Sequence, residues 1–313
     1  MSMIKRIEYL EETKKWKDED LIKVVTGIRR WGKSTLLELF IEYLKEEKID
    51  EEHIVSINLE YNFSNYKDLY FYVVSKIKND KKYHVFLDEI QNIEGFQKAV
   101  DSLYIKKNVD IYITGSNAFL LSGELATLLT ERYVEIKMLP LSFKEYVSAF
   151  SGNNNYQSLF LEYMKNGGMP GTISVLDLGI NDINKYLDSI FSTVVFKDIM
   201  ARNKITDKTI LENIIKFILE NIVYLELLRR GYRVYVGKVD DLKIDFVAEN
   251  QGGLKYFQVS LTVRDAKVLE RELRSLQRIG DHYPKYLITM DMDLSSDYDV
   301  ITKINVIDWL LEK

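Results

Sequence analysis

Cysteine is absent from this 313-residue sequence, and histidine and proline occur three times each. The lack of cysteine excludes disulfides, thiolate zinc sites and cysteine nucleophiles. The histidines stand at positions 53, 84 and 282, so no two of them have the spacing of a helical metal-binding pair. Hydrophobic residues make up 46% of the chain and charged residues 29%, which is typical of a globular protein and not of a disordered one.

Long apolar runs are also missing. The most apolar stretch, residues 214–228, is interrupted by Lys216, Glu220 and Glu226, a pattern typical of a buried helix and not of a membrane span. The N-terminus runs directly into charged residues, so we expect no signal peptide and a cytoplasmic protein. Because the formal net charge is −5, any contact with nucleic acid requires a local basic patch.

The first half of the chain alternates between strand-like and helix-like segments. Short apolar runs at 83–87 and 109–114 are typical of strands that are covered on both faces of a parallel sheet. Apolar residues recur with helical spacing at 35–47 and 69–77. The other predicted strands are 21–28, 53–59 and 133–138. This alternation predicts a doubly wound α/β domain.

The second half changes character after a polar loop at 151–155. Residues 156–228 have a mostly helical pattern with one break at 167–171. A second, smaller α/β unit is then predicted, with strands at 232–236, 241–248, 254–260 and 285–290 and a helix at 265–278. The expected parts of the chain are residues 1–150, 151–222 and 223–313.

The segment from Gly27 to Ser34 matches the phosphate-binding pattern G-x-x-x-x-G-K-[ST]. The glycines allow several backbone N–H groups to point at phosphates, and the positive end of the following helix faces the same anion. Lys33 is expected to reach the β- and γ-phosphates, while Ser34 gives an oxygen to Mg²⁺. An apolar strand before the loop and an amphipathic helix after it supply the context that the motif requires. The residues expected to bind ATP are Gly27, Ile28, Arg29, Arg30, Trp31, Gly32, Lys33, Ser34 and Thr35.

A second motif follows the apolar run at 83–87, where Asp88 and Glu89 stand side by side. Asp88 is expected to hold Mg²⁺ or its water, so the predicted metal ligands are Ser34 and Asp88. Glu89 is expected to orient and polarise the attacking water. Alone, this pair would be interpreted as a solvated acidic turn, but beside a P-loop it predicts ATP hydrolysis.

A third strand, at 109–114, is followed by the small polar residues Ser116 and Asn117. The ends of parallel strands meet at one edge of the sheet, so these residues are expected near Asp88. Either side chain could hydrogen-bond the γ-phosphate or the water. A polar turn that begins the next helix is an almost equal alternative.

These three pieces, in this order and spacing, resemble the AAA+ branch of P-loop ATPases. The Arg29-Arg30 pair in the loop and the segments at 140–143, 167–170 and 194–199 narrow the resemblance. Together they are similar to archaeal and bacterial AAA+ ATPases fused to a C-terminal restriction-endonuclease-like domain. The resemblance covers nearly the whole chain and implies a five-stranded ATPase core, a small helical lid and a second α/β domain.

The resemblance also implies a catalytic role for Arg132. In such ATPases an arginine after the sensor strand often reaches the γ-phosphate of a neighbouring subunit, so a homo-oligomer is expected. Glu131 departs from the pattern because a glycine is commoner at that position. A surface arginine paired with Glu131 or Glu135 is an equal alternative.

Two further departures concern the second half. Members of this family usually carry a winged-helix segment before the C-terminal domain, and this chain has no room for one. The sequence Leu-Glu-Asn-Ile occurs at 211–214 and again at 219–222, where that segment would lie. We hypothesise that a segment near Asn221 is missing, by deletion or by absence from this sequence. A helix that reuses a local pattern is the alternative.

The second departure concerns nuclease chemistry. Restriction-endonuclease-like folds gather a helix glutamate, a strand aspartate and an acid-x-lysine pair around Mg²⁺. The candidates are Glu226, Asp245 and the run Gln258-Val259-Ser260, in which glutamine replaces the acid and serine replaces the lysine. We therefore expect a degenerate fold that is kept for binding, with weak nuclease activity or none.

The predicted helix at 265–278 and the residue before it carry a basic stripe, defined as Arg264, Lys267, Arg271, Arg274 and Arg278. Spacings of three and four place these side chains on one face, opposite three leucines. Such a stripe suits binding to the phosphates of a DNA backbone, although the interpretation as an ordinary solvated face is slightly favoured.

The leading prediction is a Mg²⁺-dependent ATPase that couples hydrolysis to movement or remodelling of a partner, with DNA as the candidate. One alternative is a slow nucleotide-dependent switch or scaffold whose C-terminal domain binds protein. An ATP-regulated nuclease is a third, which Gln258 and Ser260 disfavour.

Overall fold

The computed structural model describes residues 4–60, 63, 65–116, 129, 132–150, 152, 154–175, 208–292 and 296–312. Its contacts divide the chain into two compact units, one of Met1–Leu141 with Met169–Gly171 and one of Ser142–Gly168 with Thr172–Lys313. The second unit joins the predicted lid helices to the C-terminal sheet, and the three-part division stays a prediction. Among the described residues, no helix combines the length and apolarity that crossing a bilayer requires.

The first unit is built on a five-stranded parallel sheet with the strand order β2-β3-β4-β1-β5. Apolar side chains on both faces bury the three inner strands β1, β3 and β4 between helices, as expected for a parallel sheet, whereas the outer strands β2 and β5 are partly exposed. Each strand predicted for this half of the sequence is present. The strands are β1 (Ile22–Gly27), β2 (Ile54–Asn58), β3 (Tyr83–Asp88), β4 (Val109–Ser116) and β5 (Tyr133–Lys137).

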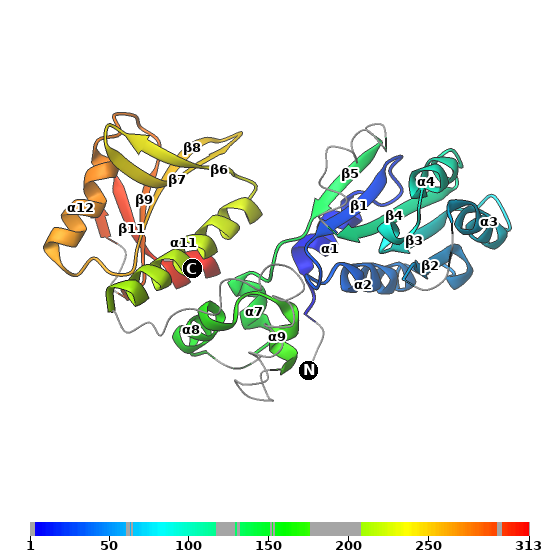
Figure 1. Cartoon of the computed structure of the whole chain (residues 1–313), viewed down its shortest axis with the longest axis horizontal. Coiled ribbons are helices and arrows are strands. Elements are labelled where there is room, and N and C mark those ends of the chain that lie inside the picture. The colour runs from blue at the N-terminus through cyan, green and yellow to red at the C-terminus, as the bar shows by residue number, and fades with distance from the viewer. Residues whose placement is uncertain are drawn as a thin grey trace. The chain divides into compact units, whose positions relative to one another are not determined.

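Helices cover both faces of this sheet (Figure 1). One hydrophobic cluster joins the sheet to α3 and α4, and a second joins it to α1 and α2. The helices α2 and α3 match the predicted spacings, whereas α1 and α4 were not predicted. The elements are α1 (Ile7–Lys15), α2 (Lys33–Glu46), α3 (Tyr66–Lys76), α4 (Phe96–Tyr104) and the short 3₁₀ helices η1 (Glu51–His53) and η2 (Ile90–Asn92).

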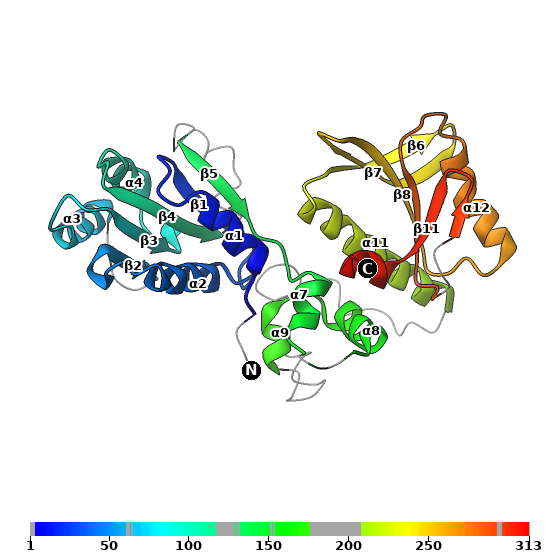
Figure 2. The ribbon, with the colours of Figure 1, turned by 180° about the vertical axis from the view of Figure 1, so that it is seen from behind.

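The second unit contains a mixed six-stranded sheet in the order β10-β11-β9-β8-β7-β6. Strands β6, β7 and β8, seen from behind in Figure 2, form an antiparallel meander. The crossover helix α12 follows β8, and β9 then pairs parallel to β8. The predicted strands and the crossover helix are present, while β10, β11 and α13 were not predicted. The strands are β6 (Arg233–Val239), β7 (Leu242–Asn250), β8 (Gly253–Ser260), β9 (Lys285–Thr289), β10 (Ser296–Tyr298) and β11 (Ile301–Asn305).

The helices of this unit follow the apolar patterns of the sequence. Helix α12 buries Leu273 and Leu276 in a cluster with the strands and leaves its basic face outward. The break predicted at 167–171 separates α8 from α9. The helices are α7 (Phe143–Ser148), α8 (Tyr156–Asn166), α9 (Pro170–Val175), α11 (Lys208–Arg229), α12 (Ala266–Gln277) and α13 (Val306–Leu311).

Candidate nucleotide site

The P-loop connects the central strand β1 to helix α2. Gly27 ends β1 with φ 153°, and a Cβ there would lie 3.1 Å from the Met138 carbonyl oxygen, so a larger residue would have to displace backbone. Arg30 and Gly32 have left-handed backbone angles, with φ of 71° and 90°. These bends turn the loop sharply into the first turn of α2, where unpaired helix N–H groups face outward.

Lys33 is the first residue of α2 and only 4% exposed. Its ammonium donates to the carbonyl oxygens of Gly27, at 3.1 Å, and Ile28, at 3.4 Å, so it lies within the curve of the loop. Burial lowers the pKa of Lys33, and the carboxylates of Glu89 and Asp88 oppose that shift. The structure therefore brings a buried cation and two acids, from separate parts of the chain, to one place.

Asp88 and Glu89 are oriented by a hydroxyl from the neighbouring strand. The Thr114 hydroxyl on β4 donates to the Asp88 carboxylate and accepts the Glu89 N–H at 2.9 Å. Thr114 is fully buried, whereas both acids are partly exposed at the end of β3. Sequence reasoning missed Thr114, although a hydroxyl within an apolar strand was a signal that could have marked it.

Glu89 also adopts an unusual backbone. Its φ is 56°, in the left-handed region that side-chain-bearing residues seldom occupy and that is concentrated at functional sites. The Gln91 side-chain amide donates to the Glu89 carboxylate and fixes its position. Gln91 was not identified from the sequence, because a single glutamine in a turn carries no pattern.

The structure also places three other residues that were expected at the site. Ser116 is the last residue of β4 and pairs in register with Gly27, so its backbone lies at the same edge of the sheet as the beginning of the P-loop. The Ser116 side chain and Asn117 lie outside the described residues. Ser34 and Thr35, partly buried in the first turn of α2, follow Lys33 directly.

Arg132 lies at the other edge of the sheet. Its carbonyl oxygen accepts the Ile22 N–H at 2.9 Å, at the beginning of β1, whereas the P-loop begins after Gly27. Gly27 lies five positions after Ile22 along the strand, a distance of about 16 Å. The guanidinium lies over the Tyr104 ring, 5.5 Å from its centre. Arg132 is therefore not part of the P-loop site of its own chain.

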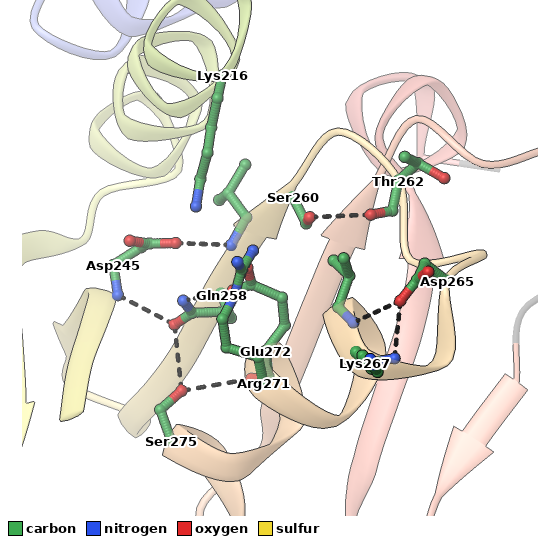
Figure 3. Close-up of polar contacts among 12 residues, drawn as sticks. Lys216, Asp245, Gln258, Ser260, Thr262, Asp265, Lys267, Arg271, Glu272 and Ser275 are labelled. Atoms are coloured by element: carbon green, nitrogen blue, oxygen red, sulfur yellow. Dashed lines mark hydrogen bonds and ion pairs between the residues drawn. The ribbon is translucent and has the colours of Figure 1, made fainter. Parts of the chain in front are cut away.

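Two of the candidates in the second unit, Asp245 and Gln258, form a hydrogen-bonded cluster with Glu272 (Figure 3). The Gln258 amide donates to Glu272 at 2.9 Å, and its oxygen accepts the Asp245 N–H at 3.3 Å. The Asp245 carboxylate accepts the Val259 N–H at 2.9 Å and lies 3.0 Å from the Lys243 ammonium. Polar groups that would otherwise be available to a ligand thus satisfy one another.

One expectation for this cluster was wrong. Glu226 binds Arg229 at 2.6 Å and Arg230 at 2.9 Å on its own helix. The helix glutamate that faces Asp245 is Glu220, whose pKa is raised by burial and then by the Asp245 carboxylate. The Ser260 hydroxyl donates to the Thr262 carbonyl oxygen at 3.2 Å and so turns away from Gln258.

The basic stripe is exposed along its whole length. Arg271 also donates to the buried Glu272, at 2.7 Å, and Arg264 lies 3.5 Å from the Asp291 carboxylate. Two of its five cations thus have acidic neighbours within the same unit. The stripe is a real surface feature, but part of its charge is already compensated.

Comparison with known proteins shows which proteins this chain resembles. A family model described as an AAA domain matches residues 19–147. An uncharacterized protein of Haemophilus influenzae is 33% identical over 403 aligned positions that cover 99% of each chain. An uncharacterized protein of Methanocaldococcus jannaschii is 31% identical over 201 residues, which span 59% of this chain and 43% of that protein.

Solved structures with a similar chain course include a Walker-type ATPase of Pyrococcus abyssi, 16% identical, with a TM-score of 0.40 over 99% of this chain and 96% of the other. Cdc6p of Pyrobaculum aerophilum is 12% identical, with a TM-score of 0.42 over 75% and 88%. The Haemophilus alignment runs over 403 positions against the 313 residues here, so at least 90 positions are gaps in this chain. That relative therefore carries additional residues that have no counterpart here, and their position in one segment near Asn221 stays a prediction.

Proposed function

The chain belongs to a family of AAA-domain P-loop ATPases, and from this premise we propose that it binds ATP with Mg²⁺ through residues 27–35 and hydrolyses it. The observation that carries the proposal is the convergence of Lys33, Asp88 and Glu89 at one edge of the sheet. Phosphoryl transfer requires positioning and charge compensation more than covalent chemistry, and these residues offer both.

Each side chain has a role that its surroundings support. Lys33 would exchange its contacts with the loop carbonyls for the β- and γ-phosphates. The hydroxyl of Ser34 and the carboxylate of Asp88 would hold Mg²⁺, which prefers such oxygen ligands and keeps several waters. Thr114 orients Asp88 for this task. Mg²⁺ would neutralise charge on the phosphates.

Glu89 would orient the attacking water. Its strained backbone and its bond to Gln91 hold the carboxylate next to Asp88 in a partly exposed position. Ser116 would add a contact to the γ-phosphate from the end of β4. Because Arg132 lies at the opposite edge, it could reach only the nucleotide of a neighbouring subunit, so its role requires a homo-oligomer.

We further propose that hydrolysis drives remodelling of a partner, with DNA as the candidate through the basic stripe on α12. The helix–three strands–helix–strand order of the second unit, α11 to β9, supports a restriction-endonuclease-like domain. The mutual bonding of Asp245, Gln258 and Glu272 disfavours cleavage, because these groups already satisfy one another.

A slow switch whose C-terminal domain binds protein is the second candidate. The observation that favours it is strand β6, which forms one edge of the sheet and exposes Tyr235 by 52% and Val236 by 68%. Edge strands with exposed apolar side chains can pair with an added strand from another protein.

The test measures ATP turnover with and without duplex DNA. Glu89→Gln should retain Mg·ATP but lose about 100-fold or more in turnover, because water loses its general base. Stimulation of the parent by DNA supports the remodelling proposal, and flat, slow turnover supports the switch. Undiminished turnover in Glu89→Gln would remove that residue from the mechanism.

A second experiment tests DNA binding with a variant in which the charges of Arg271 and Arg274 are both reversed. If the stripe binds phosphates, the variant should lower DNA affinity and reduce the salt slope by about one for each lost contact. The matched control reverses Arg233 and Lys238, two exposed cations on β6 of the same unit. Equal behaviour of the two double variants would mean that the stripe is ordinary surface.

A further inference from the structure

Arg6, just before helix α1, makes contacts that the matched family model does not include, because that model begins at residue 19. The whole residue is only 2% exposed. One nitrogen, Nη1, donates to the Trp31 carbonyl oxygen of the P-loop at 2.9 Å. The other, Nη2, donates to the Leu139 carbonyl oxygen at 2.8 Å. A single buried cation thus bridges two segments that are more than 100 residues apart.

The contact with Trp31 fixes part of the phosphate cradle. The Trp31 carbonyl and the Gly32 N–H belong to one planar trans peptide, so they point in opposite directions. By holding the carbonyl, Arg6 directs the Gly32 N–H away from itself. The residues on either side of Trp31, Arg30 and Gly32, have left-handed backbone angles, so the loop needs an anchor at this point.

The contact with Leu139 holds the segment that follows β5, through which the chain continues to the second unit. The Leu139 N–H donates to the Tyr9 hydroxyl at 3.0 Å, so helix α1 and its preceding residue bind both backbone groups of Leu139. The Arg6 guanidinium lies over the Tyr9 ring, 4.7 Å from its centre. Next to it, the Met138 N–H donates to Thr26 in β1 at 2.8 Å.

We propose that Arg6 is a positioning residue that orients the P-loop and links nucleotide binding to the exit segment, residues 138–141. The inference rests on the proposed nucleotide site. Arginine suits the task because its planar fork donates two bonds in fixed directions, whereas a lysine ammonium on a flexible stem cannot hold both carbonyls in that geometry. If the Trp31 peptide moves when phosphate binds, Arg6 would therefore transmit that displacement to Leu139.

The experiment compares Arg6→Lys, Arg6→Met and Tyr9→Phe with Lys5→Met, a control that removes an exposed cation next in the sequence. Calorimetry gives the affinity for Mg·ATP, turnover gives KM and kcat, and hydrogen exchange follows the amides of residues 137–143 with and without Mg·ATP. Thermal unfolding identifies any variant that fails to fold. If Arg6→Met fails to fold, Arg6→Lys still provides the test, because it retains the buried positive charge.

The expected results separate the two contacts. Arg6→Met should weaken the binding of Mg·ATP about tenfold and raise KM more than it lowers kcat. The affinity of Arg6→Lys should fall between that of Arg6→Met and that of the parent. Both variants should lose the nucleotide-dependent protection of residues 137–143 from hydrogen exchange. Tyr9→Phe should lose that protection while keeping the affinity, and Lys5→Met should match the parent.

Two results would overturn the inference. A folded Arg6→Lys or Arg6→Met variant with the parent's affinity, KM and protection would remove the positioning role while leaving the nucleotide site intact. If the parent itself gave no heat with Mg·ATP, the proposed function would fail first, and the role of Arg6 with it.

Discussion

The two edges of the five-stranded sheet carry the same kinds of residue but use them differently. At the carboxyl edge, Lys33, Asp88 and Glu89 form the candidate nucleotide site, and both acids are partly exposed. At the amino edge, Lys23 and Asp110 form a fully buried ion pair. The same combination of a lysine with acidic residues therefore has two interpretations: a candidate ligand site at the carboxyl edge and a structural network at the amino edge.

The difference lies in what satisfies each charge. Asp110 accepts hydrogen bonds from the Lys23 ammonium, the Tyr112 hydroxyl at 2.7 Å and the Asp18 N–H at 3.0 Å. His84 lies 3.3 Å from the same carboxylate. Asp18, His84 and Asp110 lie close enough to hold a metal ion, but the Lys23 ammonium already supplies a cation there. The buried Lys23 ammonium balances the Asp110 charge, so we expect the amino edge to act on stability.

The largest expected effect is at the amino edge. Lys23→Met leaves the Asp110 carboxylate buried without its cation, which should destabilise the first unit by about 3–5 kcal/mol. Urea unfolding measures the change, and Lys82→Met serves as a control because Lys82 is a partly exposed cation near the network. If the two variants were equally stable, the amino edge would not be a structural network.

The pH dependence of stability sharpens the same contrast. Burial alone would raise the pKa of Asp110, but His84 and Lys23 outweigh it and lower the pKa to about 2. A lowered carboxyl pKa stabilises the fold above the ordinary value of 3.8, and this contribution is lost as the pH falls toward 2. It should amount to about 2 kcal/mol near neutral pH.

Asp110→Asn should therefore be less stable than the parent at pH 6, and the gap between them should narrow as the pH falls from 4 to 2. Urea unfolding across this pH range gives the comparison. A constant gap would show that the Asp110 charge contributes nothing to folding.

A smaller effect is expected at the carboxyl edge. Thr114→Val removes the hydroxyl that contacts Asp88 and Glu89, so stability should fall by only about 1 kcal/mol. Turnover should fall more sharply, by about tenfold, because the two acids lose their orientation. Thr114→Ser, which keeps the hydroxyl, should resemble the parent. A Thr114→Val variant with normal turnover would separate Thr114 from the site.

Much of the first unit could be predicted from the sequence, because its signals are local. The strand β1, the P-loop and helix α2 lie in one continuous stretch with a strict pattern. The acids at 88 and 89 follow an apolar run that is typical of a buried strand. Arg6 could not be found in this way, because its partner Leu139 is 133 residues away and nothing in the sequence indicates the contact.

The C-terminal cluster shows another limit. Glu226 was chosen from a helix pattern, but Glu220 faces Asp245. The separation of six positions from Glu220 to Glu226 corresponds to about 240° around a helix, so the two glutamates lie on different faces. The face that meets β7 is decided by packing against the sheet, which the spacing of apolar residues in α11 indicates only loosely. Side-chain pairs such as Gln258 with Glu272 likewise depend on strand–helix packing.

The most direct test of the account is a calorimetric titration of Mg·ATP into the parent and into Lys33→Ala. We predict one site per chain with micromolar affinity, weakened at least about 100-fold in the variant, which corresponds to about 2.7 kcal/mol. Thermal unfolding should show that the variant remains folded. Absence of heat with the parent, or the same affinity in both proteins, would contradict the assignment of the carboxyl edge as the nucleotide site.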